Sequence, residues 1–390
     1  MQIIILFAGF VSAAAAADAP LDYTITLETT FEAPEDAQGW FQPRPVAVPS
    51  DDGGVREIAM TVQKILGSDF FTGLYVTKRE GPNGPWTAPV ALEALGWRKA
   101  EGEPLTTGIC DFTWGWHAPT RKAIGIGHTA KHDGKKFAGY GNRRDTVYSV
   151  YDPAEDTWSP WTVFAFPETE GDKYFFNGVH GQWLVEPDGT LLVPVYYVGP
   201  NQKFVAKGMI ARLAFDGSQL SFVERGPDLV LDIPRGLYEK SITFYDGRYY
   251  MTMRNDEKGY VAVSADGLSF STIRPWTFDD GAELGSYNTQ QKWVTHSDGL
   301  FLVYTRRGAN NDHIVRHRAP LFIARVDTER LCVLRDTERI LVPERGKALG
   351  NFDASAINAY ETWVTVAGGD AFCARIRWNR PNRLAARVNG

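Results

Sequence analysis

Short runs of apolar, β-branched and aromatic residues recur along the chain, and they come in pairs joined by a polar turn. Three pairs share one form, in which an Asp-Gly dipeptide separates the two runs: HGQWLVEPDGTLLVPVYY from His180, EKSITFYDGRYYMTMRN from Glu239 and QQKWVTHSDGLFLVYTRR from Gln290. Asp-Gly between two such runs indicates a tight β-hairpin, because both residues accept positive φ. The pattern therefore predicts three hairpin turns, at Asp188-Gly189, Asp246-Gly247 and Asp298-Gly299.

The spacing of these turns indicates a repeat. They are 58 and 52 residues apart, about the length of one propeller blade, and fainter copies of the pattern begin at Arg44, His117 and Asn351. A further pair of β-rich runs follows each copy, and no run has helical periodicity of useful length. We therefore expect an all-β protein, a six-bladed β-propeller with four-stranded antiparallel blades. Seven blades are the alternative, because the second unit is long.

The beginning of the chain contributes two further predictions. Residues 1–17, MQIIILFAGFVSAAAAA, combine a short apolar run with small residues and are typical of a signal peptide. A single domain over residues 18–390 would then be secreted or periplasmic, and no run is long enough to span a bilayer. The run YTITLETTFEAP, residues 23–34, has no partner in the first unit, so we expect it to complete the last blade and close the ring.

Charge and composition narrow the class of partner. The formal net charge is −6, which argues against a nucleic-acid or anionic-membrane partner. Twelve Trp and 16 Tyr suit both a β core and a carbohydrate site, where flat rings stack on sugar faces. Cys110, Cys332 and Cys373 fit no zinc spacing, so buried thiols are expected and one disulfide is the alternative.

A propeller places equivalent positions of its blades at one height around the axis. About eight positions before each turn stand Arg44, His117, His180, Glu239, Gln290 and Asn351. About eight positions after a turn stand His128, Tyr197, Arg254 and Arg306. Each residue alone could be a strand end bonded to a neighbouring loop, but the set predicts a polar pocket at one mouth of the ring.

The content of this pocket suggests its ligand. Several arginines without an equal number of acids would repel one another unless an anion is bound, and guanidinium forks pair with planar carboxylates. A carboxylated sugar fits both the arginines and the aromatic residues. The side chains suited to proton transfer near neutral pH are His117, His128, His180 and Glu239. The basic block from Arg306 to Arg318 is expected beside the mouth, and the histidine spacing does not indicate a metal site.

Several of these segments resemble the sialidase (neuraminidase) superfamily, and the resemblance covers most of the chain. SADGLSF, from Ser264 to Phe270, is similar to a shortened Asp-box, the turn motif of that family. The resemblance implies three carboxylate-binding arginines, Arg44, Arg254 and Arg318, with Glu239 as the partner of a tyrosine nucleophile. It also implies that Asp69 is the acid/base aspartate. The implied activity is exo-hydrolysis of a terminal acidic sugar of the sialic acid type.

One departure keeps other functions open. Phe352 stands near the position where the resemblance implies the nucleophilic tyrosine, and Tyr360 comes too late in GNFDASAINAYETW. A uronate-directed lyase or hydrolase, acting on a rhamnose–glucuronate type of linkage, is the first alternative. In a lyase, Arg254 and Arg318 would neutralise the carboxylate, while His117, His180 or Tyr197 would move the proton. A glycan-binding propeller without catalysis is the second alternative. No cofactor is expected, although a structural Ca²⁺ would fit, and the oligomeric state is left open.

Overall fold

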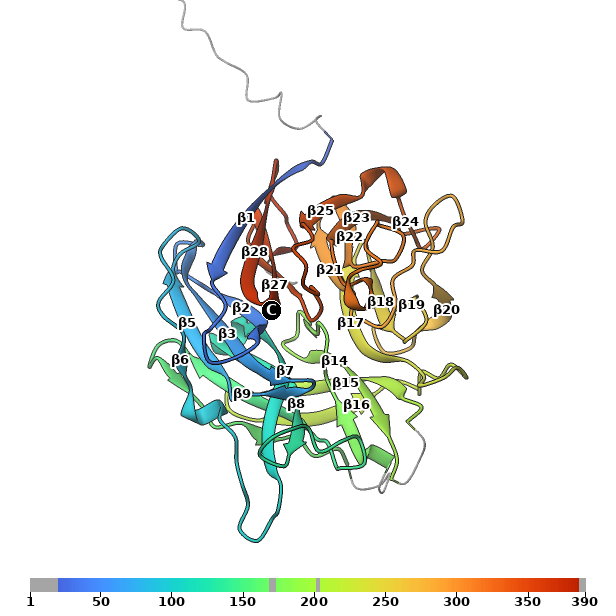
Figure 1. The fold of residues 1–390 in the computed structure, drawn as a ribbon. Coiled ribbons are helices and arrows are strands. Elements are labelled where there is room, and N and C mark those ends of the chain that lie inside the picture. The colour runs from blue at the N-terminus through green and yellow to red at the C-terminus, as the bar shows by residue number, and fades with distance from the viewer. Residues whose placement is uncertain (1–19, 168–172, 201–203, 386–390) are drawn as a thin grey trace, which may run out of the picture.

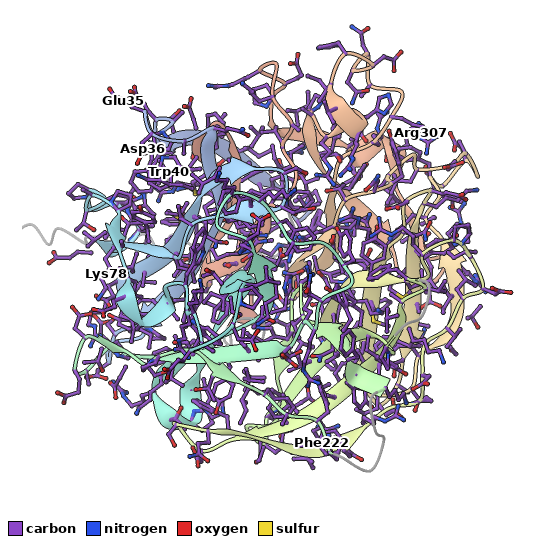
Figure 2. The ribbon with its side chains drawn as sticks, turned by 60° about the horizontal axis from the view of Figure 1, so that its bottom comes forward. Glu35, Asp36, Trp40, Lys78, Phe222 and Arg307 are labelled. Carbon is purple, nitrogen blue, oxygen red and sulfur yellow. The ribbon has the colours of Figure 1, made fainter. Side chains whose placement is uncertain are left out.

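The computed structural model describes residues 20–167, 173–200 and 204–385, which form six small antiparallel sheets around a common axis (Figure 1). The prediction of a six-bladed, all-β propeller is therefore confirmed, and the seven-bladed alternative is wrong. Side chains fill the interior of the ring (Figure 2). The signal peptide predicted over residues 1–17 lies outside the described residues.

The blades follow one another along the chain, each starting with the strand nearest the axis. The first blade comprises β2 (Gly39–Pro49), β3 (Val55–Gly67), β4 (Phe70–Phe71), β5 (Tyr75–Glu80) and β6 (Val90–Ala91). The second comprises β7 (Thr106–His117), β8 (Lys122–His132), β9 (Thr146–Asp152), β10 (Thr157–Trp158) and β11 (Thr162–Val163). The third comprises β12 (Phe176–Gly178), β13 (Leu184–Val185), β14 (Leu191–Val198), β15 (Lys207–Phe215) and β16 (Leu220–Arg225). The fourth blade comprises β17 (Tyr238–Tyr245), β18 (Arg248–Arg254), β19 (Gly259–Ser264) and β20 (Ser271–Pro275). The fifth comprises β21 (Lys292–His296), β22 (Gly299–Tyr304), β23 (Leu321–Asp327), β24 (Cys332–Val333) and β25 (Arg339–Val342). The sixth comprises β26 (Asp353–Asn358), β27 (Glu361–Gly368), β28 (Asp370–Trp378) and β1 (Tyr23–Phe31). Short 3-10 turns lie between strands: η2 (Glu93–Leu95), η3 (Ala118–Thr120), η5 (Val315–His317) and η6 (Arg335–Thr337).

The sixth blade joins the two ends of the described chain. β1 pairs antiparallel with β28, from Tyr23 opposite Trp378 to Phe31 opposite Ala371. The prediction that the early run closes the last blade is therefore confirmed. The rings of Tyr23 and Trp378 meet edge to face at 5.2 Å, and Tyr23 also contacts Phe301 of the fifth blade. This aromatic contact buries Tyr23 against the core, while the rest of β1 stays partly exposed.

The predicted hairpins occur, with one shift. Asp246 and Gly247 have φ of 46° and 76°, and they form the two-residue turn between β17 and β18. A turn at Asp188 and Gly189 also joins β13 to β14. The third turn is Ser297-Asp298 rather than Asp298-Gly299, because Gly299 already pairs with His296 as the first residue of β22.

The turn from Ser264 to Phe270 is braced from within. The Ser264 hydroxyl bonds the Asp266 carboxylate at 2.8 Å, and that carboxylate accepts the backbone N–H groups of Leu268 and Ser269. Burial acts to raise the pKa of Asp266, but these hydrogen bonds outweigh it and lower the pKa to about 2. The segment therefore stabilises a turn between β19 and β20, at the outer edge of a blade.

All three cysteines are buried and unpaired. This confirms the expectation of free thiols, and the disulfide alternative is wrong. Among the described residues, no helix is both long and apolar enough to cross a membrane.

Candidate functional site

A cavity of about 130 Å³ lies at the end of the ring where the innermost strands begin. We call it the mouth cavity. Of the eleven side chains predicted for the site, six line it: Asp69, His128, His180, Glu239, Arg254 and Arg318. Two more lie directly behind its wall, Arg44 and Gln290, where both contact Asn351.

The other three predicted side chains lie outside the mouth cavity. His117 is the last residue of β7, at the opposite end of that strand, and its Nε2 lies 2.9 Å from the carbonyl oxygen of Gly189. Tyr197 packs on Tyr174 at 4.9 Å, on the other face of β14. Arg306 makes two hydrogen bonds with Glu338, at 2.8 and 2.7 Å. The prediction gave these three a place at the mouth, and the structure does not bring them there.

Backbone conformation marks the mouth in five of the six blades. Eight non-glycine residues that line the mouth cavity have positive φ: Gln42, Asp69, Asp111, Arg235, Glu239, Asn288, Arg316 and Asn351. For Asp111 and Glu239 the strand also carries a register shift, between Cys110 and Thr113 and between Tyr238 and Lys240. A bulge turns a side chain out of the normal alternation, and strained backbone of this kind clusters at functional sites. Here the bulges point two carboxylates into the mouth cavity.

Asp111 contacts two histidines through one carboxylate oxygen and Gln42 through the other. Its Oδ2 lies 3.0 Å from His128 Nε2 and 3.1 Å from His180 Nδ1, and its Oδ1 accepts from Gln42. Burial acts to raise the pKa of Asp111, but His180 and His128 outweigh it, so the pKa is held below the usual value. Asp111 is therefore a carboxylate whose negative charge favours a positive charge on His180.

His180 and Tyr196 form an acid–base pair. The Tyr196 hydroxyl lies 2.8 Å from His180 Nε2. Since His180 Nδ1 faces the carboxylates of Asp111 and Glu239, at 3.1 and 3.5 Å, the ring proton belongs on Nδ1 and Nε2 accepts from Tyr196. Burial lowers the pKa of His180 well below its usual value, and burial raises the pKa of Tyr196. At neutral pH the pair is thus a free base beside a protonated phenol.

Arg144 lies against this pair. Its Nη1 donates to the Tyr196 oxygen at 3.0 Å and lies 3.4 Å from His128 Nε2, while its guanidinium stacks over Phe176 at 4.5 Å. None of the described carboxylates forms an ion pair with it. The positive charge of Arg144 stabilises negative charge on Tyr196. It also disfavours protonation of His128 and of His180.

The opposite wall carries the predicted arginines. Arg254 pairs with Glu239 at 2.5 Å and donates to the side chain of Asn288. Arg318 donates to the backbone oxygen of Asn288, its Nε is buried without a partner, and no ion pair joins it to a described carboxylate. Burial, together with the charges of Arg254 and Arg316, lowers the pKa of Arg318 to about 9. Arg318 is therefore a charged group whose surroundings favour a bound anion.

Three side chains could together offer ligand atoms to a metal ion: Cys110, Asp111 and His128, whose donor atoms lie within 4.8 Å of one another. Burial and the Asp111 charge raise the pKa of the Cys110 thiol, which disfavours the thiolate that binds metal. The Arg144 guanidinium also lies 3.4 Å from Nε2 of His128. These contacts favour a hydrogen-bonded cluster over a cation site.

Sequence reasoning missed three of the central residues. Asp111 is the counterpart of Glu239 in the second blade, and the same spacing counted back from η3 would have identified it. Tyr196 was one position from the predicted Tyr197, on the opposite face of the strand. Arg144 begins no predicted run and follows a long loop, so no local signal marks it.

Phe352 is fully buried in the core between the fifth and sixth blades, with Leu349 and Val366. Because it does not line the mouth cavity, we expect Phe352→Leu to leave kcat/KM within about twofold while lowering the free energy of unfolding by about 1–2 kcal/mol. Steady-state kinetics and chemical denaturation would check this. A large loss of turnover in a well-folded variant would contradict it.

Comparison with known proteins identifies the fold. No family model and no curated protein matches the chain. Among solved structures, a Trypanosoma rangeli sialidase in complex with the inhibitor DANA matches with a TM-score of 0.60 and 12% identity, over 90% of this chain and 59% of that one. A protein of unknown function from Dyadobacter fermentans matches with a TM-score of 0.57 and 12% identity, over 90% and 99% of the chains. An intramolecular trans-sialidase from Ruminococcus gnavus matches with a TM-score of 0.52 and 12% identity, over 93% and 98%. At these identities the likeness is one of fold alone.

Proposed function

We propose that the protein binds a carboxylated sugar in the mouth cavity and cleaves its glycosidic bond by β-elimination. The observation that carries the proposal is a charged arginine, Arg318, in the same cavity as the acid–base pair of His180 and Tyr196. A uronate carboxylate bound to Arg318 and Arg254 would lose negative charge, which acidifies the proton on the adjacent C5. The fold likeness to a sialidase bound to an inhibitor agrees with a sugar ligand.

The pair supplies both proton transfers. The Tyr196 hydroxyl turns from His180 Nε2 toward O4 as the substrate binds. The freed Nε2 takes the C5 proton, and the C5 electron pair forms the C4–C5 double bond as the C4–O4 bond breaks. Tyr196 donates its proton to the departing O4. The positive charge on His180 is stabilised by Asp111, and the negative charge on Tyr196 by Arg144. The proton then returns from His180 to Tyr196 through their hydrogen bond, which restores the pair.

Hydrolysis of a sialoside is the second candidate, because Asp69 and Glu239 share the cavity with Arg254 and Arg318. The group that this mechanism lacks is a tyrosine at the position of Phe352, so its nucleophile would have to be one of the three tyrosines that line the cavity, Tyr140, Tyr196 or Tyr238. This second mechanism leaves the neutral His180 without a separate task, which is why we favour elimination.

The test is to incubate the purified protein with sialosides and with uronate-containing polysaccharides. Elimination predicts products that absorb near 235 nm and are lighter than hydrolysis products by one water. Free sialic acid without this absorbance would overturn the proposal in favour of hydrolysis. Binding without any product would leave a glycan-binding propeller.

The pH profile offers an independent check. Since burial lowers the pKa of His180 well below the ordinary histidine value of 6.5, the free base persists at lower pH. We expect kcat/KM to show no inflection near pH 6.5 and to fall only at lower pH, as His180 gains a proton. An acid limb centred near pH 6.5 would contradict the assignment of His180 as the base.

A further inference from the structure

The mouth cavity holds more unpaired cations than unpaired anions. Five of the described arginines line it, and two of them form ion pairs, Arg235 with Asp256 and Arg254 with Glu239. No described carboxylate forms an ion pair with the other three: Arg144, Arg316 and Arg318. Among the lining carboxylates that the structure describes, Asp69 alone is likewise without an ion pair. A bound uronate carboxylate would therefore balance only part of the excess positive charge.

Arg316 is the unpaired arginine for which the proposed function gives no task. Arg144 lies against Tyr196 and Arg318 binds the carboxylate, whereas the Arg316 side chain is exposed at the rim of the cavity. Its guanidinium makes no hydrogen bond with a described residue. The charge of Arg316 contributes, after burial and Arg254, to lowering the pKa of Arg318. A group bound by Arg316 would therefore lie next to the bound carboxylate.

The turn η5 holds Arg316 in a strained conformation. Arg316 and His317 have φ of 57° and 52°, which is unfavourable for residues other than glycine. The side-chain amide of Asn311 donates to the His317 carbonyl oxygen at 3.3 Å. The Tyr287 hydroxyl donates to His317 Nδ1 at 2.6 Å, and His317 Nε2 donates to Asp312 at 3.1 Å. Strain that surrounding contacts maintain is typical of functional sites, and here it places a free guanidinium at the rim.

We propose that Arg316 binds a second anionic group of the substrate, a sulfate ester or a second carboxylate, beside the uronate carboxylate. This inference rests on the proposed function. A guanidinium presents a planar fork of N–H donors, which can pair with two oxygens of either group. Because Arg316 is exposed, water screens the pair, so the second anion should tighten binding about 3- to 5-fold. The preferred substrate is thus a dianion.

The test compares uronides that carry one or two negative charges. Methyl glucuronoside is the monoanion. The dianions are its 2-O- and 3-O-sulfates, the glucuronide of a hexose sulfate, and a 1,3-linked diglucuronate. None carries a sugar on O4, so elimination cannot cleave them during isothermal titration. At low ionic strength the wild-type protein should bind at least one dianion about 3- to 5-fold more tightly than the monoanion, and high salt should reduce this preference. Preference for a sulfated ligand identifies a sulfate ester as the second group, and preference for diglucuronate identifies a carboxylate.

Two substitutions of Arg316 test its role. Arg316→Ala should abolish the preference and leave the affinity for methyl glucuronoside within about twofold of the wild-type value. Arg316→Gly should abolish it too, while the midpoint of urea denaturation rises because glycine accepts the left-handed backbone. The matched control is Arg248→Ala, which removes an exposed arginine at the start of β18, the strand whose other end reaches the mouth at Arg254. This control should keep the preference.

The outcomes separate this inference from the proposed function. If the wild-type protein binds methyl glucuronoside but binds no dianion more tightly, the inference alone is overturned. Retention of the wild-type preference by Arg316→Ala would also overturn it alone. If the wild-type protein binds neither methyl glucuronoside nor any of the dianions, the proposed function fails and the inference fails with it.

Discussion

Replacement of Tyr196 by Phe is expected to lower kcat by about 10³-fold and to leave KM nearly unchanged. The variant keeps the ring and loses only the hydroxyl that lies between His180 Nε2 and Arg144 Nη1, at 2.8 and 3.0 Å. A group that donates its proton only as the C4–O4 bond breaks acts in the transition state, and such groups contribute about 10²- to 10⁴-fold. Steady-state kinetics on a uronate substrate, followed at 235 nm, would measure the effect.

Tyr197→Phe is the matched control. It removes the same hydroxyl from the next residue of β14, whose ring packs on Tyr174 outside the mouth cavity. Its kcat should stay within about threefold of the wild-type value. A substrate with an acidic aryl leaving group at O4 needs less proton donation, so it should restore much of the rate of Tyr196→Phe. Equal losses in the two tyrosine variants, or no recovery with the aryl substrate, would remove Tyr196 from the role of acid.

The sequence predicts the propeller well because short local patterns mark each repeat. Asp-Gly turns and alternating runs fix the hairpins, and the spacing of about one blade fixes their number. The early run at Tyr23 could be assigned to the last blade because every other run already had a partner. These features depend on local backbone preferences, which a single sequence records directly.

The site was predictable only where a recognised turn allowed counting along a strand. In the fourth blade the turn at Asp246 led correctly to the mouth positions of Glu239 and Arg254. In the second blade the chain reverses through η3 and Arg121, with φ of 54°, so no Asp-Gly marks the turn and His117 was taken in place of Asp111. In the third blade the predicted position was wrong by one residue. Because neighbouring residues of a strand point to opposite faces, Tyr197 was predicted at the mouth in place of Tyr196.

Contacts between blades were beyond the reach of the sequence. Arg144 depends on Tyr196 and Phe176, which belong to the next blade along the chain. Such contacts arise when the ring closes, and neither periodicity nor turn chemistry in one segment specifies them.

Replacement of Arg318 by Ala is expected to lower kcat/KM by about 10²- to 10³-fold without destabilising the fold. The activity falls because the carboxylate loses a guanidinium that neutralises it as the C5 proton leaves. The free energy of unfolding should stay equal or rise, since Arg318 is held near Arg254 with a buried, unpartnered Nε and no described acid pairs with it. Kinetics and urea denaturation of the same samples would measure the two effects.

The controls separate carboxylate recognition from loss of charge. Arg121→Ala removes an exposed arginine that pairs with Asp51 at the surface, far from the mouth cavity, and should change neither quantity by a measurable amount. Arg318→Lys keeps the charge but not the fork, so it should recover only part of the activity. On a uronate methyl ester, which carries no carboxylate charge, wild-type protein and Arg318→Ala should act at similar, low rates. If Arg318→Ala binds free glucuronate as tightly as the wild-type protein, Arg318 does not hold the carboxylate. A stable variant with low activity would instead mean that the protein retains an unpaired positive charge in its mouth because its ligand supplies the missing negative one.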